Sequence, residues 1–438
     1  MARGAPRQPA RRARLRSLFL DTAPLRLDRD YRYIWSGQAI NAIGNQITRI
    51  TLPFQVYALT GSTLAIAALT ATQLVPIVLF ALFGGSVADF VDRRRLLVVT
   101  QIVLATCSLL LALLAFGVLG GPPPLPLILV VAFAAAGFGA IDQPARSSSI
   151  PRLVAPERLP SAIALNQLNS QTAQVIGPAI GGLLIATVGV SGAYLVDVAT
   201  FSASLVALVS IHPIPPLPGA VRPGLAAVRE GLRFAGHHRL ILSTFVIDLN
   251  AMVFGMPAAL FPVLALDVFH VGPEGFGLIA AAPGFGAFLG ALLSGWVRGV
   301  RDVGRAIILA VVAWGSAIAA FGLATFSLPL ALVFLATAGA ADVLSAVFRS
   351  TAIQLETPDQ LRGRVTALHI LVVTSGPRLG DLEAATLASA VGAQASVVSG
   401  GILCVLGVLL VARLFPELVG YRPAVLAAPV AVTEVASG

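Results

Sequence analysis

The fold is decided by residues 63–119, which read TLAIAALTATQLVPIVLFALFGGSVADFVDRRRLLVVTQIVLATCSLLLALLAFGVL. Two apolar runs, 63–88 and 96–119, stand on either side of one short charged gap that carries three consecutive arginines, Arg93 to Arg95. Each run has about 20 residues or more, enough for an α-helix to cross roughly 30 Å of hydrocarbon. We therefore expect a pair of transmembrane helices joined by a basic loop.

The same alternation extends over the whole chain. All 29 basic residues are arginines, and all except Arg49 and Arg378 fall in alternate gaps between apolar segments. This distribution obeys the positive-inside rule, so it predicts an even number of crossings with both termini in the cytoplasm. The twelve expected helices lie near 33–57, 63–88, 96–119, 125–145, 161–187, 191–211, 240–266, 275–297, 304–326, 328–348, 364–390 and 396–415.

Composition agrees with an all-α integral membrane protein. The chain is 57% hydrophobic and 11% charged, with a mean hydropathy of +0.89, so it cannot present a charged surface to water on all sides. Its net charge of +9 could indicate a nucleic-acid partner. Because the arginines alternate with apolar segments, they favour the anionic cytoplasmic face of a lipid bilayer instead. No nucleic-acid partner is expected.

The chain reads as two pseudo-symmetric halves of six helices each. Arg146 and the pair Gly177-Pro178 recur about 200 residues later as Arg349 and Gly376-Pro377. Such duplication is typical of transporters whose substrate site lies between the halves near the midplane. The expected organisation is a disordered basic cytoplasmic tail over 1–30, halves over 31–212 and 239–415, a proline-rich linker with an amphipathic helix over 213–238, and a cytoplasmic tail over 416–438.

Several motifs carry a resemblance to a known family. The loop sequence Gly85-Ser-Val-Ala-Asp89-Phe-Val-Asp92-Arg93 resembles the signature of the major facilitator superfamily. The further motifs Gln143-Pro-Ala-Arg146, Gly177-Pro-Ala-Ile-Gly-Gly182, Asp197-Val-Ala-Thr-Phe201 and Arg362-Gly-Arg-Val365 resemble its branch of siderophore exporters and drug or macrolide efflux proteins. The resemblance implies outward transport, since a glycine- and proline-rich fifth helix accompanies export in this superfamily. The chain departs from the signature at Phe90 and Asp92, where a basic residue and a glycine are usual.

Polar residues inside the helices are the candidate site, because charges in a membrane helix require a compensating role. Along 33–57, the polar side chains follow one face and comprise Gln38, Asn41, Asn45, Thr48 and Arg49. We expect this face to line a central cavity, although Arg49 could instead snorkel to the outer interface. Arg378 and Asp381 are spaced so that they could pair within their helix, or serve the substrate or a proton.

Proton coupling is expected from a buried carboxylate. Asp248 lies about nine residues inside the membrane from Arg239, with Asn250 nearby, and is the first candidate. Asp342 is the second, whereas Asp197 is interpreted as structural. The fifth helix should contribute Asn166 and Gln174 to the cavity wall, while Gly177 and Gly181 permit close helix approach and Pro178 a bend.

A last group of candidate residues consists of oppositely charged pairs that could form a cytoplasmic gate. Asp89 and Arg93 lie four residues apart, as do Asp142 and Arg146. Opposite charges gathered at one membrane face can hold that face closed through ion pairs that break when it opens. The alternative is that these residues only anchor the helices and set topology.

The missing motifs restrict the function. The chain has no lysine and hence no Walker A loop, no HExxH or GxSxG motif, and two cysteines in different halves. Catalytic residues, metal sites and cofactors are therefore not expected, and an ion gradient is the expected energy source. The prediction is a proton-coupled alternating-access exporter of a small organic molecule, most simply a siderophore, functioning as a monomer in a bacterial inner membrane. The alternatives are multidrug or macrolide efflux and, from another class, a non-transporting receptor or scaffold.

Overall fold

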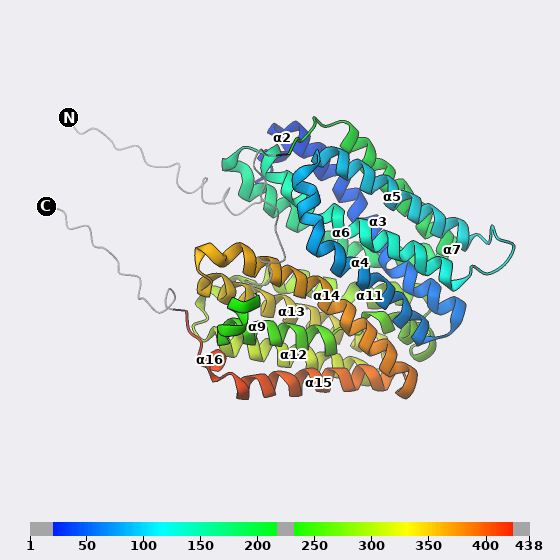
Figure 1. The fold of residues 1–438 in the computed structure, drawn as a ribbon. Coiled ribbons are helices and arrows are strands. Elements are labelled where there is room, and N and C mark those ends of the chain that lie inside the picture. The colour runs from blue at the N-terminus through cyan, green and yellow to red at the C-terminus, as the bar shows by residue number, and fades with distance from the viewer. Residues whose placement is uncertain (1–20, 217–231, 424–438) are drawn as a thin grey trace, which may run out of the picture.

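The computed structural model describes residues 21–216 and 232–423, which form helices joined by short turns and contain no strand (Figure 1). The elements are α2 (Ala23–Leu27), α3 (Arg29–Thr60), α4 (Thr63–Phe90), α5 (Arg93–Ala115), α6 (Leu125–Leu153), η1 (Pro156–Arg158), α7 (Leu159–Val209), α9 (Arg239–Phe254), η2 (Ala258–Leu260), α10 (Phe261–Val263), η3 (Leu264–Val268), α11 (Gly272–Leu292), η4 (Ser294–Gly299), α12 (Val303–Leu323), α13 (Leu328–Glu356), α14 (Asp359–Val391), α15 (Ala393–Leu414) and α16 (Pro416–Val419).

The all-α membrane architecture expected from the sequence is confirmed. Nine segments within the described residues are long and apolar enough to cross a bilayer. Helices α3 and α14 are not among them, and both carry the polar residues of the candidate site. One of the nine, Pro156–Val209, spans 54 residues, which is long enough for two crossings. The count of twelve crossings stays a prediction.

Two glycines make equivalent turns in the two halves of the chain. Gly189 interrupts α7 with a φ of 75°, and Gly392 separates α14 from α15 with a φ of 90°. Positive φ values of this kind are accessible to glycine and strained for other residues. The two turns are 203 residues apart, the same separation as Arg146 and Arg349, so the repeat seen in the motifs extends to backbone conformation.

Asp92, where the superfamily usually has glycine, is the N-cap residue of α5. Its side chain accepts a hydrogen bond of 2.9 Å from the backbone N–H of Arg95 and thereby caps the start of α5. An aspartate is a favoured N-cap because it satisfies a donor that the helix leaves free. The departure from the superfamily signature at this position therefore strengthens the beginning of the helix that follows.

The seventh apolar segment is not one continuous helix, contrary to the prediction of a helix over 240–266. Helix α9 ends at Phe254, and the chain continues through Gly255 and Pro257 into the short turns η2 and α10 and the π-helical turn η3. Proline lacks an N–H and clashes with the preceding turn, so a helix breaks ahead of it. The freed carbonyl of Gly255 accepts a hydrogen bond of 2.8 Å from the Trp314 indole.

The tails are shorter than expected, so far as the structure describes them. Residues 1–30 were expected to be a disordered tail, yet within the described part of this range Ala23–Leu27 forms α2 and α3 begins at Arg29. The cause is Asp28, which accepts two hydrogen bonds of 2.8 Å from the Arg158 guanidinium. At the other end α16 buries Leu418, and the carbonyl of Tyr421 accepts from the N–H of Gly304. Residues 1–20 and 424–438, and 217–231 of the linker, lie outside the described residues.

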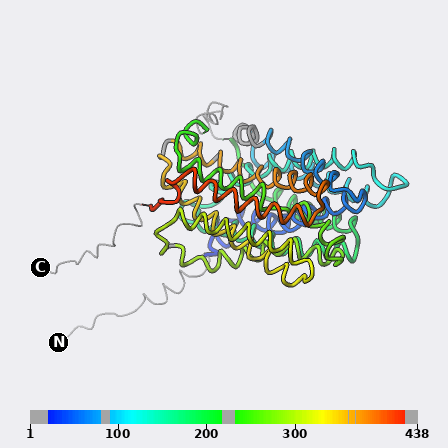
Figure 2. Tube along the Cα trace, turned by 90° about the horizontal axis from the view of Figure 1, so that it is seen from below, coloured from blue at the N-terminus to red at the C-terminus, as the bar shows by residue number. Residues whose placement is uncertain are grey.

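The helices form two bundles that lie side by side (Figure 1) and run along one common direction (Figure 2). Helices α3 to α7 pack mainly on one another, as do α9 to α15, and the bundles meet where α7 contacts α11 and α4 contacts α14. One large hydrophobic core contains residues of both bundles, including Tyr57 and Phe276. Smaller cores around Ile34, around Tyr31 and around Ile241 each belong to one bundle. The bundles thus share a core at one end only.

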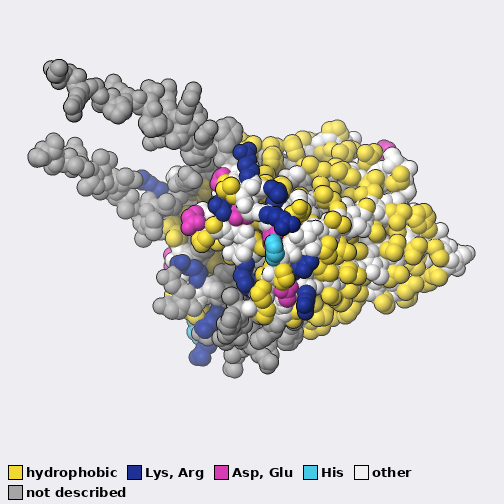
Figure 3. All heavy atoms as spheres, turned by 90° about the horizontal axis from the view of Figure 1, so that it is seen from above, with side chains coloured by type: hydrophobic (Ala, Val, Ile, Leu, Met, Phe, Trp, Pro, Cys, Tyr) yellow, Lys and Arg dark blue, Asp and Glu magenta, His cyan; other side chains and the backbone are white. Residues whose placement is uncertain are grey.

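Charged side chains gather at the other end, where α2 and α16 lie, while hydrophobic side chains cover the rest of the face in Figure 3. We call this end the arginine-rich end, and the opposite one the outer end after the orientation that the arginines predict. The exposed hydrophobics along the length of the helices include Leu109, Val130, Leu183 and Leu406. Side chains of this kind suit lipid contact because the bilayer core offers no partner for polar groups.

Candidate functional site

A cavity of about 590 Å³ lies between the bundles. Helices α3 to α7 form one wall, and η2, α11 and α14 form the other. Small-molecule sites commonly occupy roughly 300–1,000 Å³, so the space suits one organic molecule of moderate size.

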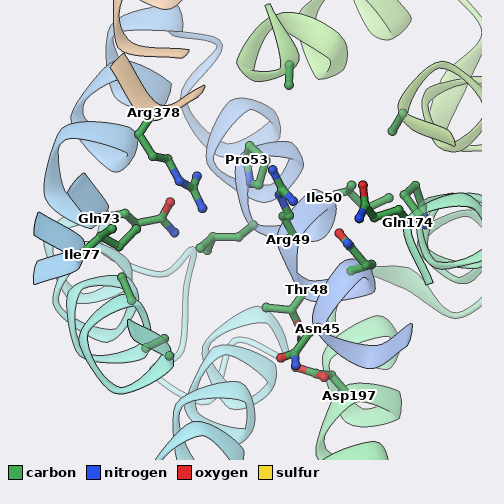
Figure 4. A pocket seen from close by; sticks show the side chains of 18 of the residues that line it. Asn45, Thr48, Arg49, Ile50, Pro53, Gln73, Ile77, Gln174, Asp197 and Arg378 are labelled. Carbon is green, nitrogen blue, oxygen red and sulfur yellow. Dashed lines mark hydrogen bonds between the residues drawn. The ribbon is translucent and has the colours of Figure 1, made fainter. Parts of the chain in front are cut away.

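The first wall is dominated by the polar face of α3. All five residues of the predicted stripe, Gln38, Asn41, Asn45, Thr48 and Arg49, lie in the lining. Their spacing of three or four residues places them on one side of an α-helix. Figure 4 shows Asn45, Thr48 and Arg49 along the same stretch of α3. Arg49 is directed into the cavity and not towards lipid.

Two arginines from opposite bundles share this cavity. Arg49 comes from α3 and Arg378 from α14, and Figure 4 shows Gln73 of α4 on the same side as Arg378. Neither guanidinium has a hydrogen bond or an ion pair with another described residue, although each lies within the electrostatic field of the other. Two unpaired cations across one cavity form a natural binding site for an anion.

Asp381 lies one turn beyond Arg378 but is engaged elsewhere. Its carboxylate accepts a hydrogen bond of 2.8 Å from the backbone N–H of Ala259. That N–H is free because Ala259 lies in the first turn of η2, after the end of α9 at Phe254, so no preceding helical carbonyl accepts from it. The ion pair between Arg378 and Asp381 that their spacing allows is not formed, which leaves the arginine available to a bound molecule.

The structure brings together part of the predicted pathway and separates the rest. The lining contains six of the predicted pathway residues: Asn41, Asn45, Arg49, Gln174, Arg378 and Asp381. Four others, Asn166, Asp248, Asn250 and Asp342, do not line the cavity. Asn250 donates a hydrogen bond of 2.9 Å to the carbonyl of Cys404 and so joins α9 to α15.

Asp248 lies in a separate buried cluster of the second bundle. Its carboxylate is 2.7 Å from the guanidinium of Arg349, and the two side chains are only 1% and 2% exposed. Arg349 also donates to the Ser345 hydroxyl, and His369 and Asp342 lie within electrostatic reach. The pair links α9 to α13 beside the cavity wall.

The predicted gate residues of α6 form an ion pair within one bundle. Arg146 and Asp142 are 3.1 Å apart, and both border the cavity. Thr100 and Gln101 of α5 donate to the same Asp142 oxygen at 2.7 Å and 3.2 Å. Arg93 is buried and donates to the carbonyl of Ser148 at 3.0 Å. The side chain of Asp89 lies outside the described residues.

The outer end of the cavity is closed by contacts between the bundles. The Tyr57 hydroxyl of α3 donates to the carboxylate of Asp267 in η3. The Phe54 and Phe276 rings meet with their centroids 5.3 Å apart. Gly182 of α7 packs directly on α11, since a Cβ atom there would lie 2.5 Å from the Cα of Gly277.

The glycines of α7 also bring that helix against α3. A Cβ on Gly177 would lie 2.4 Å from the Gln46 Cβ, and one on Gly181 would meet the Ile50 side chain at 2.9 Å. Pro178 faces the cavity between them. The close approach expected of this motif is therefore made on α3, in addition to α11.

Sequence reasoning missed several residues of the site. Gln73 gives a detectable signal, since it is an amide in the middle of an otherwise apolar run. Phe276 and the contact between Tyr57 and Asp267 give none, because only the packing of two distant helices brings them together.

Relatives of the chain are found along nearly its full length. Residues 21–418 match the family model described as transmembrane secretion effector. The enterobactin exporter EntS of Citrobacter koseri is 26% identical over 404 residues, covering 92% of this chain and 95% of that protein. The enterobactin exporter EntS of Shigella boydii is 26% identical over 395 residues, covering 90% of this chain and 94% of that protein.

Solved structures share the fold at low sequence identity. A POT family transporter in complex with 5-aminolevulinic acid is similar, with a TM-score of 0.71, 12% identity and coverage of 89% of this chain and 97% of that one. A bacterial homologue of the human lysosomal transporter Spinster, in an inward-facing and unoccupied conformation, is also similar. Its TM-score is 0.70 at 16% identity, and the match covers 92% of this chain and 100% of that one.

Proposed function

The chain belongs to the transmembrane secretion effector family of the major facilitator superfamily, and we propose that it exports a small organic anion from the bacterial cytoplasm in exchange for protons. Family membership makes it a multi-pass membrane transporter and not an enzyme. The observation that carries the proposal is the cavity between the bundles with its two unpaired guanidiniums, Arg49 and Arg378.

The proposed substrate is a siderophore of the catecholate type. Catecholates and other anions can accept hydrogen bonds from guanidinium groups on two sides of a cavity, and such charge-assisted bonds are about twice as strong as neutral ones. The relatives named as enterobactin exporters support this class. The amides Asn41, Asn45, Gln73 and Gln174 would serve the neutral polar groups of the same molecule.

Loading from the cytoplasm follows from the proposed orientation. The positive-inside rule supports an arginine-rich end, and with it both termini, on the cytoplasmic side of a bacterial inner membrane. The bundles have separate cores at that end and a shared core, with the Tyr57 and Phe54 contacts, at the outer end. This arrangement supports a state that is open inward and closed outward, the state in which an exporter takes up its substrate.

Proton coupling is proposed for the buried carboxylates of the second bundle. Asp248 can exchange its partner Arg349 for a proton, since an unpaired buried carboxylate is costly when ionised and much less so when protonated. Asp342 and Asp381 are the further candidates. The gate is proposed to use Asp89, Arg93, Asp142 and Arg146, whose pairing would change when the arginine-rich end closes. We propose that a single chain performs the whole cycle.

The test is transport by the purified protein in liposomes. Vesicles with an acidic lumen should accumulate labelled enterobactin against its gradient, and a protonophore should abolish the accumulation. Arg413→Gln, which removes an exposed arginine outside the cavity, is the matched control and should transport as the wild type does. Accumulation of a macrolide and not of enterobactin would establish drug efflux instead. Transport of neither would refute the proposed substrate class.

A further inference from the structure

A second buried carboxylate borders the cavity in the first bundle. Asp197 of α7 is 0% exposed and lies in the cavity lining. Its carboxylate accepts hydrogen bonds from the hydroxyls of Thr48 in α3, at 2.6 Å, and Ser108 in α5, at 2.7 Å. The Thr200 hydroxyl on its own helix is 3.3 Å away. Figure 4 shows Thr48 and Asp197 joined at the edge of the cavity.

Asp197 differs from the other fully buried carboxylate, Asp248, in its charge balance. Asp248 has Arg349 as an ion-pair partner, and Asp142 has Arg146. Asp381 is 8% exposed and makes no ion pair, but it accepts from the backbone N–H of Ala259 and lies within electrostatic reach of Arg378 and Arg49. The partners of Asp197 among the described residues are hydroxyl groups and no cation. Burying an ionised carboxylate without a cation costs several kcal/mol, and protonation removes most of that cost. This position is therefore suited to holding a proton.

The surrounding hydroxyls can serve both protonation states. A hydroxyl donates to an ionised carboxylate, and after protonation its oxygen can accept from the carboxyl O–H. The O···O distances of 2.6 Å and 2.7 Å are those of hydrogen bonds. Oxygens that share a metal ion at about 2.3–2.6 Å lie farther apart. The hydroxyls are thus arranged as hydrogen-bonding partners of the carboxylate, an arrangement that a proton can join.

The first bundle leaves room for this group where a side chain would block it. A Cβ atom on Gly44 would lie 2.0 Å from the Thr200 hydroxyl and 2.5 Å from the Asp197 carboxylate. The repeat separation of 203 residues takes Asp197 to Gly400, which packs on the carbonyl of Phe254. The second bundle has the same fold without a carboxylate at this place, so the architecture of a bundle does not require one.

We propose that Asp197 is a proton-binding site of the first bundle, filled from the cavity and coupled to the substrate through Thr48 and the neighbouring Arg49. A hydronium ion in the cavity gives its proton to the carboxylate oxygen and leaves as water. One of the two hydroxyls that donated to this oxygen, that of Thr48 or that of Ser108, then accepts from the new carboxyl O–H, while the other turns its own O–H to another acceptor. Because Thr48 and Arg49 are consecutive in α3, a change at Asp197 acts directly on the segment that presents the guanidinium to the substrate. The inference rests on proton-driven export.

Infrared spectroscopy of the reconstituted protein tests proton binding without a substrate. The wild type should show a carboxylic-acid C=O band that grows as the buffer is made acidic, and Asp197→Asn should lose that component while Asp248→Asn keeps it. An unchanged band in Asp197→Asn would overturn the proposal. A band whose titration depends on Na⁺ would assign the site to a metal cation and overturn it equally.

A second variant separates titration from simple support of the fold. Ser108→Ala removes one donor to the ionised form and keeps the carboxylate, so the titration midpoint of the band should move to higher pH by about one unit. The Tyr194 hydroxyl lies within electrostatic reach of Asp197 and donates to Gln55 at 2.8 Å. The Cys107 thiol and Arg49 line the same cavity as Asp197. A midpoint unmoved by Ser108→Ala would contradict direct titration of Asp197.

Transport distinguishes this inference from the proposed function. In liposomes loaded with enterobactin, Asp197→Asn should retain exchange of labelled for unlabelled enterobactin and lose accumulation driven by an imposed pH difference. If the wild type fails both assays, the proposed function fails and the infrared result still decides the proton site. If the wild type succeeds and Asp197→Asn accumulates enterobactin equally well, the inference alone is wrong.

Discussion

The most decisive prediction concerns the two cavity arginines. We expect Arg378→Gln and Arg49→Gln each to weaken anion binding while leaving the protein as stable as before or more so. Neither guanidinium has a hydrogen bond or ion pair within the described chain, so its removal breaks no described internal contact. Both side chains carry a positive charge into the same cavity, so each substitution also relieves repulsion between them.

The magnitudes follow from the chemistry of the site. A hydrogen bond to a charged group contributes about 1.5–3 kcal/mol, so loss of one arginine should lower the affinity for an anionic substrate by about 10- to 150-fold. Two like charges about 4 Å apart repel by about 4 kcal/mol at an effective dielectric constant of about 20, and the repulsion falls with distance. Relief of this repulsion is therefore a stabilisation of at most that order.

The assay measures both quantities on the same samples. Thermal unfolding in detergent reports stability, and the concentration dependence of enterobactin uptake into liposomes reports affinity. Arg413→Gln controls for the change in net charge. If Arg378→Gln lowers the unfolding temperature and leaves the half-saturating concentration unchanged, then the arginine is structural, and the assignment of an anion site is wrong.

Three further predictions test topology, coupling and closure. A tag inserted after Gly61 should be accessible from outside intact cells and one after Arg95 should not; the reverse result would contradict the orientation. Asp248→Asn, which mimics the protonated form and abolishes the charge opposite Arg349, should still bind enterobactin but lose pH-driven accumulation, with Asp342→Asn milder; retention of pH-driven transport by both would remove these residues from the coupling. Tyr57→Phe loses the hydrogen bond between the bundles and should lengthen the distance between spin labels on Gly121 and Phe326; an unchanged distance would show that the hydroxyl does not hold the outer end closed.

The fold could be predicted because its signals are local and repeated. Apolar length, the alternation of arginines and the glycines at repeated positions each act within a few residues, so no knowledge of packing is needed to interpret them. The polar face of α3 is also a local signal. Five polar residues at helical spacing indicate how that helix is rotated about its axis, and hence which side of it faces the cavity. Its placement on the cavity wall, with Arg49 directed inward, agrees with this interpretation.

The position of Asp248 could not be predicted in the same way. Its distance along the helix from Arg239 indicates depth in the membrane, but a single polar residue does not fix how the helix is rotated about its axis. That rotation is set by packing against α13 and α15, through Arg349 and the Asn250 contact with Cys404. Knowing how deep Asp248 lies in the membrane, without knowing how α9 is rotated, does not tell whether its side chain faces the cavity or the interior of the bundle.

The repeat also shows how the two bundles came to differ. Arg146 and Arg349 are equivalent by the separation of 203 residues, but the carboxylate of Asp142 corresponds to the hydroxyl of Ser345. Arg146 therefore pairs within its own helix, whereas Arg349 takes its partner Asp248 from α9 and ties two helices together.

This exchange of partners assigns different mechanical roles to the bundles. In the first, α3 makes no ion pair with α6 and its polar face is left to the cavity and to Asp197. In the second, α9 and α13 are joined by a buried ion pair. Separating these helices while Asp248 is ionised would leave two lone buried charges, whereas a proton on Asp248 removes its charge and its attraction to Arg349 and leaves only the arginine charged. A proton at Asp248 would release α9 from α13, whereas a proton at Asp197 would act on α3 and Arg49. Protonation of Asp197 would then affect substrate release, and protonation of Asp248 would affect movement within the second bundle. Both events would be driven by the same proton gradient.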